Sequence, residues 1–137
     1  MTAVLLDTGP LVAYVVSAEA HHRWACERFA ALQAPVFVCE AVITEAAYLL
    51  ERQGATCDLI WAMLRTGAMR LTFDLETEFE SVAALMRRYA DVPMDLADAC
   101  LVRMSELHRD CRVLTTDSDF RFYRRFGRQV VPLICPA

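Results

Sequence analysis

Lysine is absent from this sequence, so all 14 basic side chains are arginines. The absence bears on two classes of protein that, like this chain, place an aspartate directly after a first apolar run. Haloacid-dehalogenase-like phosphatases usually employ a lysine and need a second aspartate two residues after the first, where this chain has Gly9. Response-regulator receivers likewise rely on a lysine. The composition therefore excludes both classes.

Glycine is scarce as well, with four residues in 137. This bears on the triplet Asp7-Thr8-Gly9, which is also the catalytic triplet of retroviral-type aspartic proteases. Such a protease would be largely β, with a glycine-rich flap and its aspartate paired with a symmetry mate in a dimer. The residues after Gly9 instead show helical spacing, so the protease interpretation fails on fold.

Long apolar runs and targeting signals are missing too. Although 56% of the residues are hydrophobic, charges interrupt every apolar stretch well before the roughly 20 residues that a membrane span needs. The N-terminus has neither a basic segment nor a small-residue cleavage site. We therefore expect a soluble, cytoplasmic protein without a membrane partner.

Cysteine motifs are also absent: there is no CxxC pair, and no histidine lies at zinc-finger spacing. The six cysteines are scattered along the chain. A cytoplasmic protein keeps its thiols reduced, and free cysteine behaves as a small hydrophobic residue. We therefore expect free, mostly buried cysteines rather than a zinc site or a disulfide framework.

Short apolar runs alternate with helical patterns from end to end. Strands are expected at Ala3–Leu6, Val36–Val38, Arg70–Phe73, Arg112–Thr115 and Val130–Leu133. Helices are expected between them, over about 10–16, around 25–32, and over about 40–53, 56–66, 75–89 and 95–109. This alternation predicts an α/β fold with a central, mostly parallel sheet of about five short strands, covered on both faces. We expect one domain over residues 1–137.

Two aspartates follow expected strands. Asp7 comes directly after the first strand, and Asp117 follows the fourth. Each has an ordinary explanation, because aspartate often caps a helix or closes a turn. However, ligands of parallel sheets bind outside the carboxyl ends of the strands. Both aspartates are therefore also placed to reach a functional edge.

Two further acids lie on the apolar faces of expected helices. Glu45 has Val42 three residues before it and Leu49 four residues after it, and Asp98 is followed by apolar residues at i+3 and i+4. Asp95, one turn before Asp98, is expected to be the N-cap of its helix. A carboxylate that points into a core needs a partner.

Four converging carboxylates would repel one another. At an effective dielectric near 20, a pair about 4 Å apart repels by roughly 4 kcal/mol. A divalent cation removes that penalty, and oxygen ligands without a nearby histidine or cysteine set favour Mg²⁺ or Mn²⁺. Such a cluster is typical of metal-assisted phosphodiester hydrolysis. The net charge of −4 would ordinarily argue against a nucleic-acid partner, but less so if the acids gather in one metal-binding cleft.

At these residues the sequence resembles the PIN-domain ribonucleases, in particular the VapC-like toxins of type II toxin–antitoxin pairs. Four stretches carry the resemblance, in this order along the chain: VLLDTGPLVAYV, ITEAAYLL, PMDLADACLVRMSEL and VLTTDSDFRFYR. The resemblance implies a three-layer α/β/α PIN-like domain with Mg²⁺- or Mn²⁺-dependent endoribonuclease activity. It also implies a protein that is often a homodimer and is inhibited by a small cognate antitoxin.

The resemblance also assigns roles by position. The catalytic, metal-binding acids are then Asp7, Glu45, Asp98 and Asp117. Auxiliary roles fall to Thr8, Asp95, Thr116 and Asp119. The stretch TDSDF offers two aspartates at close spacing. Asp117 is preferred as the fourth ligand because it lies nearest the strand end, and Asp119 is the alternative.

Residues 121–128, RFYRRFGR, mix arginines with aromatic residues. Arg121, Arg124 and Arg125 are expected to bind RNA phosphates, with neighbouring aromatic rings available for base stacking. A solvated face over an aromatic core contact explains the same composition equally well. Tyr48 is expected in the core or in an interface rather than in a base-stacking platform. The apolar early helices favour a groove for a partner helix.

A non-catalytic PIN fold that serves as a binding module or scaffold is the competing hypothesis. An inactive protein would gain stability by replacing inward-pointing acids, because a buried charge needs a partner. This chain retains all four acids, which favours the enzyme. Chelation of divalent metal separates the two enzyme classes, because an acid-cluster nuclease should lose all activity whereas an aspartic protease would stay active.

Overall fold

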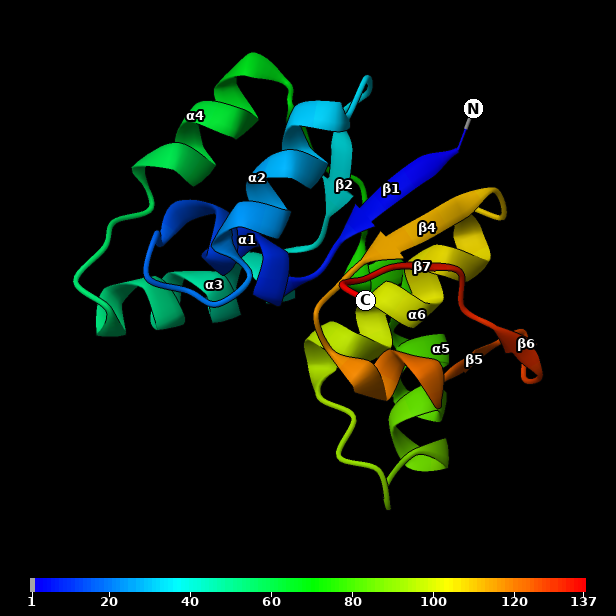
Figure 1. The fold of residues 1–137 in the computed structure, drawn as a ribbon. Coiled ribbons are helices and arrows are strands. Elements are labelled where there is room, and N and C mark those ends of the chain that lie inside the picture. The colour runs from blue at the N-terminus through cyan, green and yellow to red at the C-terminus, as the bar shows by residue number, and fades with distance from the viewer. Residues whose placement is uncertain (1) are drawn as a thin grey trace.

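The fold is built on a five-stranded parallel sheet in the order β3-β2-β1-β4-β7. The computed structural model describes residues 2–137, and Figure 1 shows the two central strands, β1 and β4, side by side. The five strands are β1 (Ala3–Leu6), β2 (Val36–Val38), β3 (Met69–Leu71), β4 (Cys111–Leu114) and β7 (Leu133–Ile134). The expected α/β class with a parallel sheet of five short strands is confirmed.

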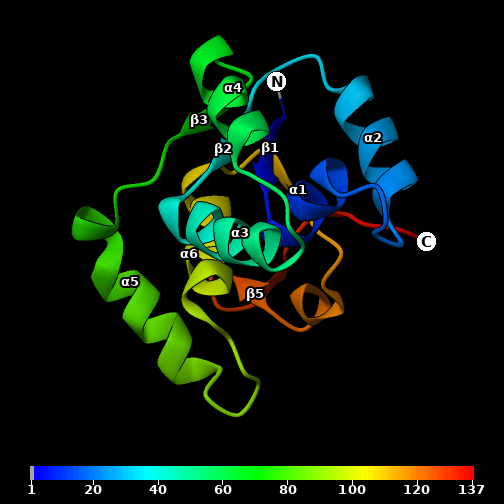
Figure 2. The ribbon, with the colours of Figure 1, turned by 90° about the vertical axis from the view of Figure 1, so that its left-hand side faces the viewer.

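Within residues 2–137, six α-helices flank the sheet. They are α1 (Thr8–Val15), α2 (His22–Ala31), α3 (Glu40–Arg52), α4 (Asp58–Thr66), α5 (Leu75–Arg88) and α6 (Leu96–Leu107). Figure 2 shows α1 and α2 on one side and α5 on the other, while α3 contacts both α1 and α6. Buried apolar residues of the central strands, such as Leu5 and Leu114, form the core with these helices. The molecule thus has the expected α/β/α layers.

Local sequence explains where several helices begin and end. Asp74 and Asp95 are the N-caps of α5 and α6, because their side chains accept hydrogen bonds from the exposed N–H groups of the first turn. The helix α4 ends at Gly67, whose φ of 81° is left-handed and is easily adopted only without a side chain. No helix within residues 2–137 is long and apolar enough to cross a membrane. All six cysteines are free.

The expected last strand, Val130–Leu133, is wrong in its bounds. Val130 belongs to a small antiparallel hairpin of β5 (Arg124–Arg125) and β6 (Gln129–Val130), outside the main sheet. The fifth strand of the main sheet begins at Leu133. Pro132 separates the two segments because it has no N–H to donate, although its carbonyl accepts a hydrogen bond of 2.8 Å from the Val113 N–H.

Candidate acid-cluster site

Asp7 lies at the carboxyl end of β1 and is only 5% exposed. Its Oδ1 accepts a hydrogen bond of 2.7 Å from the Thr8 N–H, so Asp7 is indeed the N-cap of α1. Its Oδ2 accepts a hydrogen bond of 2.7 Å from the Thr115 hydroxyl. Burial raises the pKa of Asp7 to about 6, because removal from water opposes ionisation more than the two hydrogen bonds favour it. The charges of Asp117 and Asp95 raise this pKa further.

Asp98 lies in the first turn of α6 and is 7% exposed. Its Oδ2 accepts a hydrogen bond of 3.0 Å from the Tyr123 hydroxyl, which is itself fully buried. Burial first, and then the charges of Asp95 and Asp7, raise the pKa of Asp98 to about 8. The pKa of Tyr123 is raised by burial and by Asp98, so its hydroxyl remains a donor at neutral pH.

Glu45 and Asp95 lie closer to solvent at the same site. Glu45 is half-buried on α3, and its pKa is raised by burial and by the charges of Asp95 and Asp7. Asp95 is exposed and, as expected, caps α6 by accepting a 2.8 Å hydrogen bond from the Asp98 N–H. The Thr8 hydroxyl lowers the pKa of Glu45, yet it makes no full hydrogen bond. Thr8 Oγ1 is therefore a buried oxygen without a partner.

Asp117 follows β4 and acts on both buried carboxylates. Its charge raises the pKa of Asp7 and of Asp98. It also caps the short 3₁₀ helix Ser118–Arg121 by accepting a 2.9 Å hydrogen bond from the Asp119 N–H. Asp117 therefore has both functions expected for this position: it caps the turn after β4, and it lies near the buried carboxylates of Asp7 and Asp98.

Two residues of the site were missed in the sequence. Thr115 was expected only as a strand residue, but its hydroxyl donates to Asp7 and accepts a 2.9 Å hydrogen bond from the Asp117 N–H. For Tyr123, an RNA-stacking role and an aromatic core contact were both left open. The side chain is buried, and its hydroxyl donates to Asp98. The neighbouring threonine, Thr116, instead lies against Gly9, where a side chain would collide with its hydroxyl. Because successive side chains of a strand point to opposite faces, the sequence shows that Thr115 and Thr116 point in different directions. It does not show that the end of β1, with Asp7, lies beside Thr115.

The acids are near one another without forming a closed ligand set. Within residues 2–137, no three His, Cys, Asp or Glu side chains are arranged so that they hold one metal ion together. The donor chemistry nevertheless fits a hard cation, because the buried groups are carboxylate oxygens and the unpartnered Thr8 hydroxyl. Mg²⁺ commonly binds through only one or two carboxylates and keeps several waters. The donor chemistry of these residues therefore fits Mg²⁺ or Mn²⁺, and the binding of such an ion stays a prediction.

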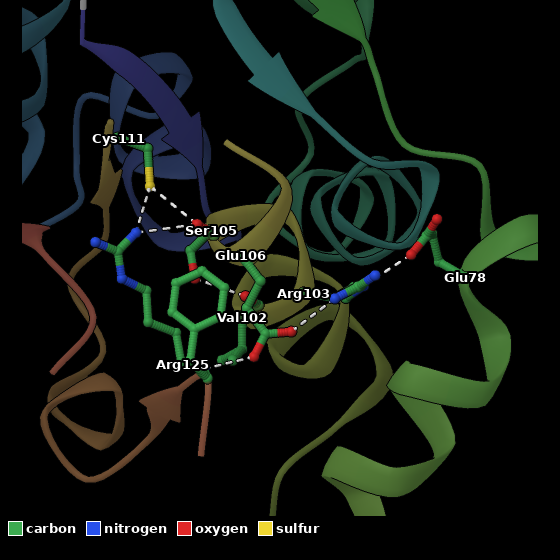
Figure 3. Close-up of polar contacts among 8 residues, drawn as sticks. Glu78, Val102, Arg103, Ser105, Glu106, Cys111 and Arg125 are labelled. Atoms are coloured by element: carbon green, nitrogen blue, oxygen red, sulfur yellow. Dashed lines mark hydrogen bonds and ion pairs between the residues drawn. The ribbon is translucent and has the colours of Figure 1, made fainter. Parts of the chain in front are cut away.

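The three arginines expected at RNA have different surroundings. Arg125 is half-buried, and its Nη1 donates to the carbonyls of Ser105 at 3.0 Å and Arg109 at 2.9 Å. Figure 3 shows this guanidinium turned toward Ser105 and Cys111. Arg124 donates from Nη1 to the carbonyls of Arg121 and Tyr123. Arg121 is exposed and lines a hollow of about 290 Å³ together with Asp117.

Replacing Arg125 by alanine is expected to lower the free energy of unfolding by about 3 kcal/mol or more. The change removes a charged donor from two backbone carbonyls, and such hydrogen bonds each stabilise by roughly 1.5 to 3 kcal/mol. Urea denaturation measures the effect. Arg121→Ala is the matched control and should leave the midpoint unchanged. Equal midpoints for Arg125→Ala and the wild type would show that this contact does not stabilise the fold.

The chain is thus an α/β/α protein whose parallel sheet carries a cluster of acids, two of them buried, near the carboxyl end of its central strand. The PIN domain model matches residues 4–125. This chain belongs to the PIN-domain family. The match covers most of the chain, and the extent of a single domain over residues 1–137 stays a prediction.

Individual proteins agree with the family match. Ribonuclease VapC26 of Mycobacterium tuberculosis is 29% identical over 116 residues, which cover 83% of this chain and 86% of that protein. The crystal structure of Mycobacterium tuberculosis VapC20, a toxin that cleaves the sarcin–ricin loop, has a TM-score of 0.75 at 20% identity and covers 93% of this chain and 99% of its own. A toxin–antitoxin complex from Klebsiella pneumoniae has a TM-score of 0.64 at 19% identity, covering 86% and 90%. The two structures show likeness of fold, and the expected resemblance to VapC-like PIN domains is confirmed.

Proposed function

We propose that this chain is a metal-dependent endoribonuclease that hydrolyses RNA phosphodiester bonds, and that it is the toxin of a toxin–antitoxin pair. Family membership and the names of the relatives support the proposal. The observation that carries it is the burial of Asp7 and Asp98 within reach of the charges of Asp95 and Asp117. Such repulsion destabilises the fold unless a cation or a proton neutralises it.

In this proposal Asp7 and Asp98 hold Mg²⁺ or Mn²⁺, with Glu45 and Asp117 as further oxygen donors. When bound, the ion supplies charge neutralisation and an activated water for in-line displacement at phosphorus. Without an ion, Asp98 keeps a proton up to about pH 8. Its carboxyl group must release that proton before it binds a cation.

The residues around the two buried carboxylates position them. The Thr8 N–H and the Thr115 hydroxyl each bind a different oxygen of Asp7, and the Tyr123 hydroxyl binds one oxygen of Asp98. These contacts restrict the rotation of both carboxyl groups, so little reorganisation is needed when a cation binds. Thr115 and Tyr123 are therefore positioning residues.

RNA would reach the acids past the exposed arginine beside them. Arg121 lines the same hollow as Asp117, and its guanidinium suits a backbone phosphate. Arg124, half-buried and bonded to local carbonyls, would add a second positive charge nearby. We assign phosphate contacts to these two residues and a structural task to Arg125.

The proposed toxin needs a cognate antitoxin. A hollow of about 510 Å³ opens beside α2 and α4 and is lined by apolar side chains that include Tyr14, Phe29, Leu32 and Met63. The apolar face of a partner helix suits such a surface. The fold neighbour from Klebsiella pneumoniae is a toxin–antitoxin complex, which supports an antitoxin as the partner. We also propose a homodimer that acts in the cytoplasm.

Chelation of metal tests the activity. The purified protein, incubated with end-labelled single-stranded RNA and Mg²⁺, is expected to produce internal cleavage products, and an excess of EDTA should remove all activity. Added Mg²⁺ or Mn²⁺ should restore it, because the carboxylates need a cation. Cleavage that persists in EDTA would contradict the metal proposal. The absence of any cleavage with Mg²⁺ would favour a non-catalytic scaffold. This is the second candidate because no closed three-ligand set occurs within residues 2–137.

A further inference from the structure

Another hollow, of about 470 Å³, opens next to the acid cluster. It is lined by Ala41, Thr44, Glu45, Tyr48, Asp95, Leu96 and Ala97. Glu45 and Asp95 are members of the acid cluster, and their charges act on one another. The hollow is therefore continuous with the proposed catalytic site. Its volume falls within the roughly 300 to 1,000 Å³ of ligand-binding clefts.

The most prominent side chain of this hollow is an exposed tyrosine. Tyr48 lies one helical turn after Glu45 on α3 and is 58% exposed, so of its two expected places, the core and an interface, the core is excluded. Leu96, at the start of α6, adds a further apolar surface that is 41% exposed. Thr44, also in the lining, turns its hydroxyl to the Glu40 carbonyl at 2.9 Å. The hollow thus offers apolar and aromatic surface with few directional donors.

An arginine orients the tyrosine ring. The Arg52 guanidinium carbon lies 5.6 Å from the centroid of the Tyr48 ring, and Arg52 Nη1 donates to the Tyr48 hydroxyl at 3.0 Å. Tyrosine has few rotatable bonds, and this contact restricts them further, so the ring is a preorganised platform. Arg52 does not line the hollow itself, but through Tyr48 its guanidinium places a positive charge next to a lining whose own charged residues, Glu45 and Asp95, are acidic.

We propose that this hollow is a base-binding subsite, in which one unstacked nucleobase of the substrate RNA stacks on Tyr48 while Arg52 contacts an adjacent phosphate. The inference rests on the proposed ribonuclease function and names a specificity element of the same site. Single-stranded nucleic acid is commonly held by this combination of an aromatic ring and a guanidinium. Because stacking reads no base edge, the subsite selects unpaired RNA rather than one base.

A second copy of this chain is the competing occupant of the same surface. The charges argue for RNA. The interior of a protein interface is depleted of charged groups, whereas covering this hollow with protein would desolvate Glu45, Asp95 and Arg52 together. A nucleotide instead brings its own phosphate to Arg52 and leaves the carboxylates facing the proposed metal.

The test compares Tyr48→Ala and Tyr48→Trp with Phe79→Ala as a matched control. Phe79 is similarly exposed, at 54%, but lies on α5 and does not line this hollow. Steady-state cleavage of single-stranded RNA with Mg²⁺ should show KM raised about tenfold or more in Tyr48→Ala, with a smaller change in kcat. Tyr48→Trp should restore KM, and Phe79→Ala should match the wild type.

A binding measurement separates this inference from the proposed catalysis. RNA that contains 2-aminopurine, mixed with the Asp7→Asn variant to prevent cleavage, should lose fluorescence on stacking, and Tyr48→Ala in the same background should abolish that loss. If wild-type protein fails to cut RNA but the Tyr48-dependent quenching persists, the ribonuclease proposal falls and the subsite stands. Unchanged KM and unchanged quenching in Tyr48→Ala would overturn the subsite. The subsite would also be overturned if Tyr48→Ala converted a dimer to a monomer in sedimentation and this change accounted for all of the lost activity. In that case a second copy of the chain would cover the Tyr48 ring.

Discussion

The Asp98→Asn variant is expected to cleave RNA at least about a thousandfold more slowly than the wild type while unfolding at an equal or higher temperature. A metal ion contributes several kcal/mol of charge stabilisation in the transition state, and each 1.36 kcal/mol corresponds to a factor of ten in rate. The uncharged amide lacks the charge that binds the ion. Its oxygen still accepts the Tyr123 hydroxyl, which now donates to Asp98 Oδ2 at 3.0 Å. The variant therefore removes the free-energy cost of burying an ionisable carboxyl group beside other acids without losing this hydrogen bond.

Other aspartates of the site provide the controls. Asp7→Asn should lose cleavage activity as Asp98→Asn does. Its single amide oxygen can still cap α1 by accepting from the Thr8 N–H, but the Thr115 hydroxyl then loses its acceptor, so we expect a smaller gain in stability than for Asp98→Asn. Asp117→Asn and Asp119→Asn decide which aspartate of the TDSDF stretch is the fourth donor, and we expect the larger loss for Asp117. Cleavage kinetics and thermal denaturation measure both properties on the same samples. Wild-type rates in either Asp7→Asn or Asp98→Asn would make the metal-site assignment wrong.

The metal-free protein is expected to lose several kcal/mol of stability as the pH rises from 4 to 9. The pKa values of Asp7 and Asp98 in the folded protein are about 6 and about 8, above the ordinary value of 3.8. Between these values the folded state binds more protons than the unfolded state, so the free energy of unfolding falls with pH. For Asp7 alone, a shift of about two pKa units corresponds to about 3 kcal/mol.

Added Mg²⁺ should reverse this loss in a pH-dependent way. At pH 8 the ion binds the ionised carboxylates and should raise the melting temperature by several degrees, whereas at pH 5 it competes with protons and should have little effect. The double variant Asp7→Asn, Asp98→Asn is the control and should show a flatter pH profile and no response to Mg²⁺. A wild-type stability that rises between pH 5 and 8 without metal would refute the assignment of buried, repelling carboxylates.

Most of the secondary structure was predictable because it follows from neighbouring residues. The strands Ala3–Leu6 and Val36–Val38 occur as expected, and the helix expected over 40–53 spans Glu40–Arg52. The last strand was misplaced because Val130 and Leu133 have equal apolar character, and only their partners distinguish them. Val130 pairs with β5, whereas Leu133 pairs with β4.

The candidate site was less predictable than the fold. Asp7, Glu45, Asp98 and Asp117 stood out because each sits after a strand or on an apolar helix face. The structure brings the other three each within electrostatic reach of Asp7. Their role as metal ligands stays a prediction. Arg125 was expected at RNA because arginine next to aromatic residues suits nucleic acid, but its guanidinium is bonded to the Ser105 carbonyl in the last turn of α6 and to the Arg109 carbonyl in the α6–β4 connection. Composition cannot reveal which acceptors a guanidinium will meet.

The sequence by itself determined the alternation of strands and helices and the placement of acids at strand ends, since both depend on residues a few positions apart. Only the tertiary structure decided which side chains surround those acids. The register that pairs Leu6 with Leu114 brings Thr115 to Asp7 across 108 residues of sequence. Likewise, the packing of Tyr123 brings its hydroxyl to the Asp98 carboxyl group, where it donates a hydrogen bond. Hydrogen bonding and loss of water at a carboxylate depend on distant segments packed around it, which is why the raised pKa values emerge only in the folded chain.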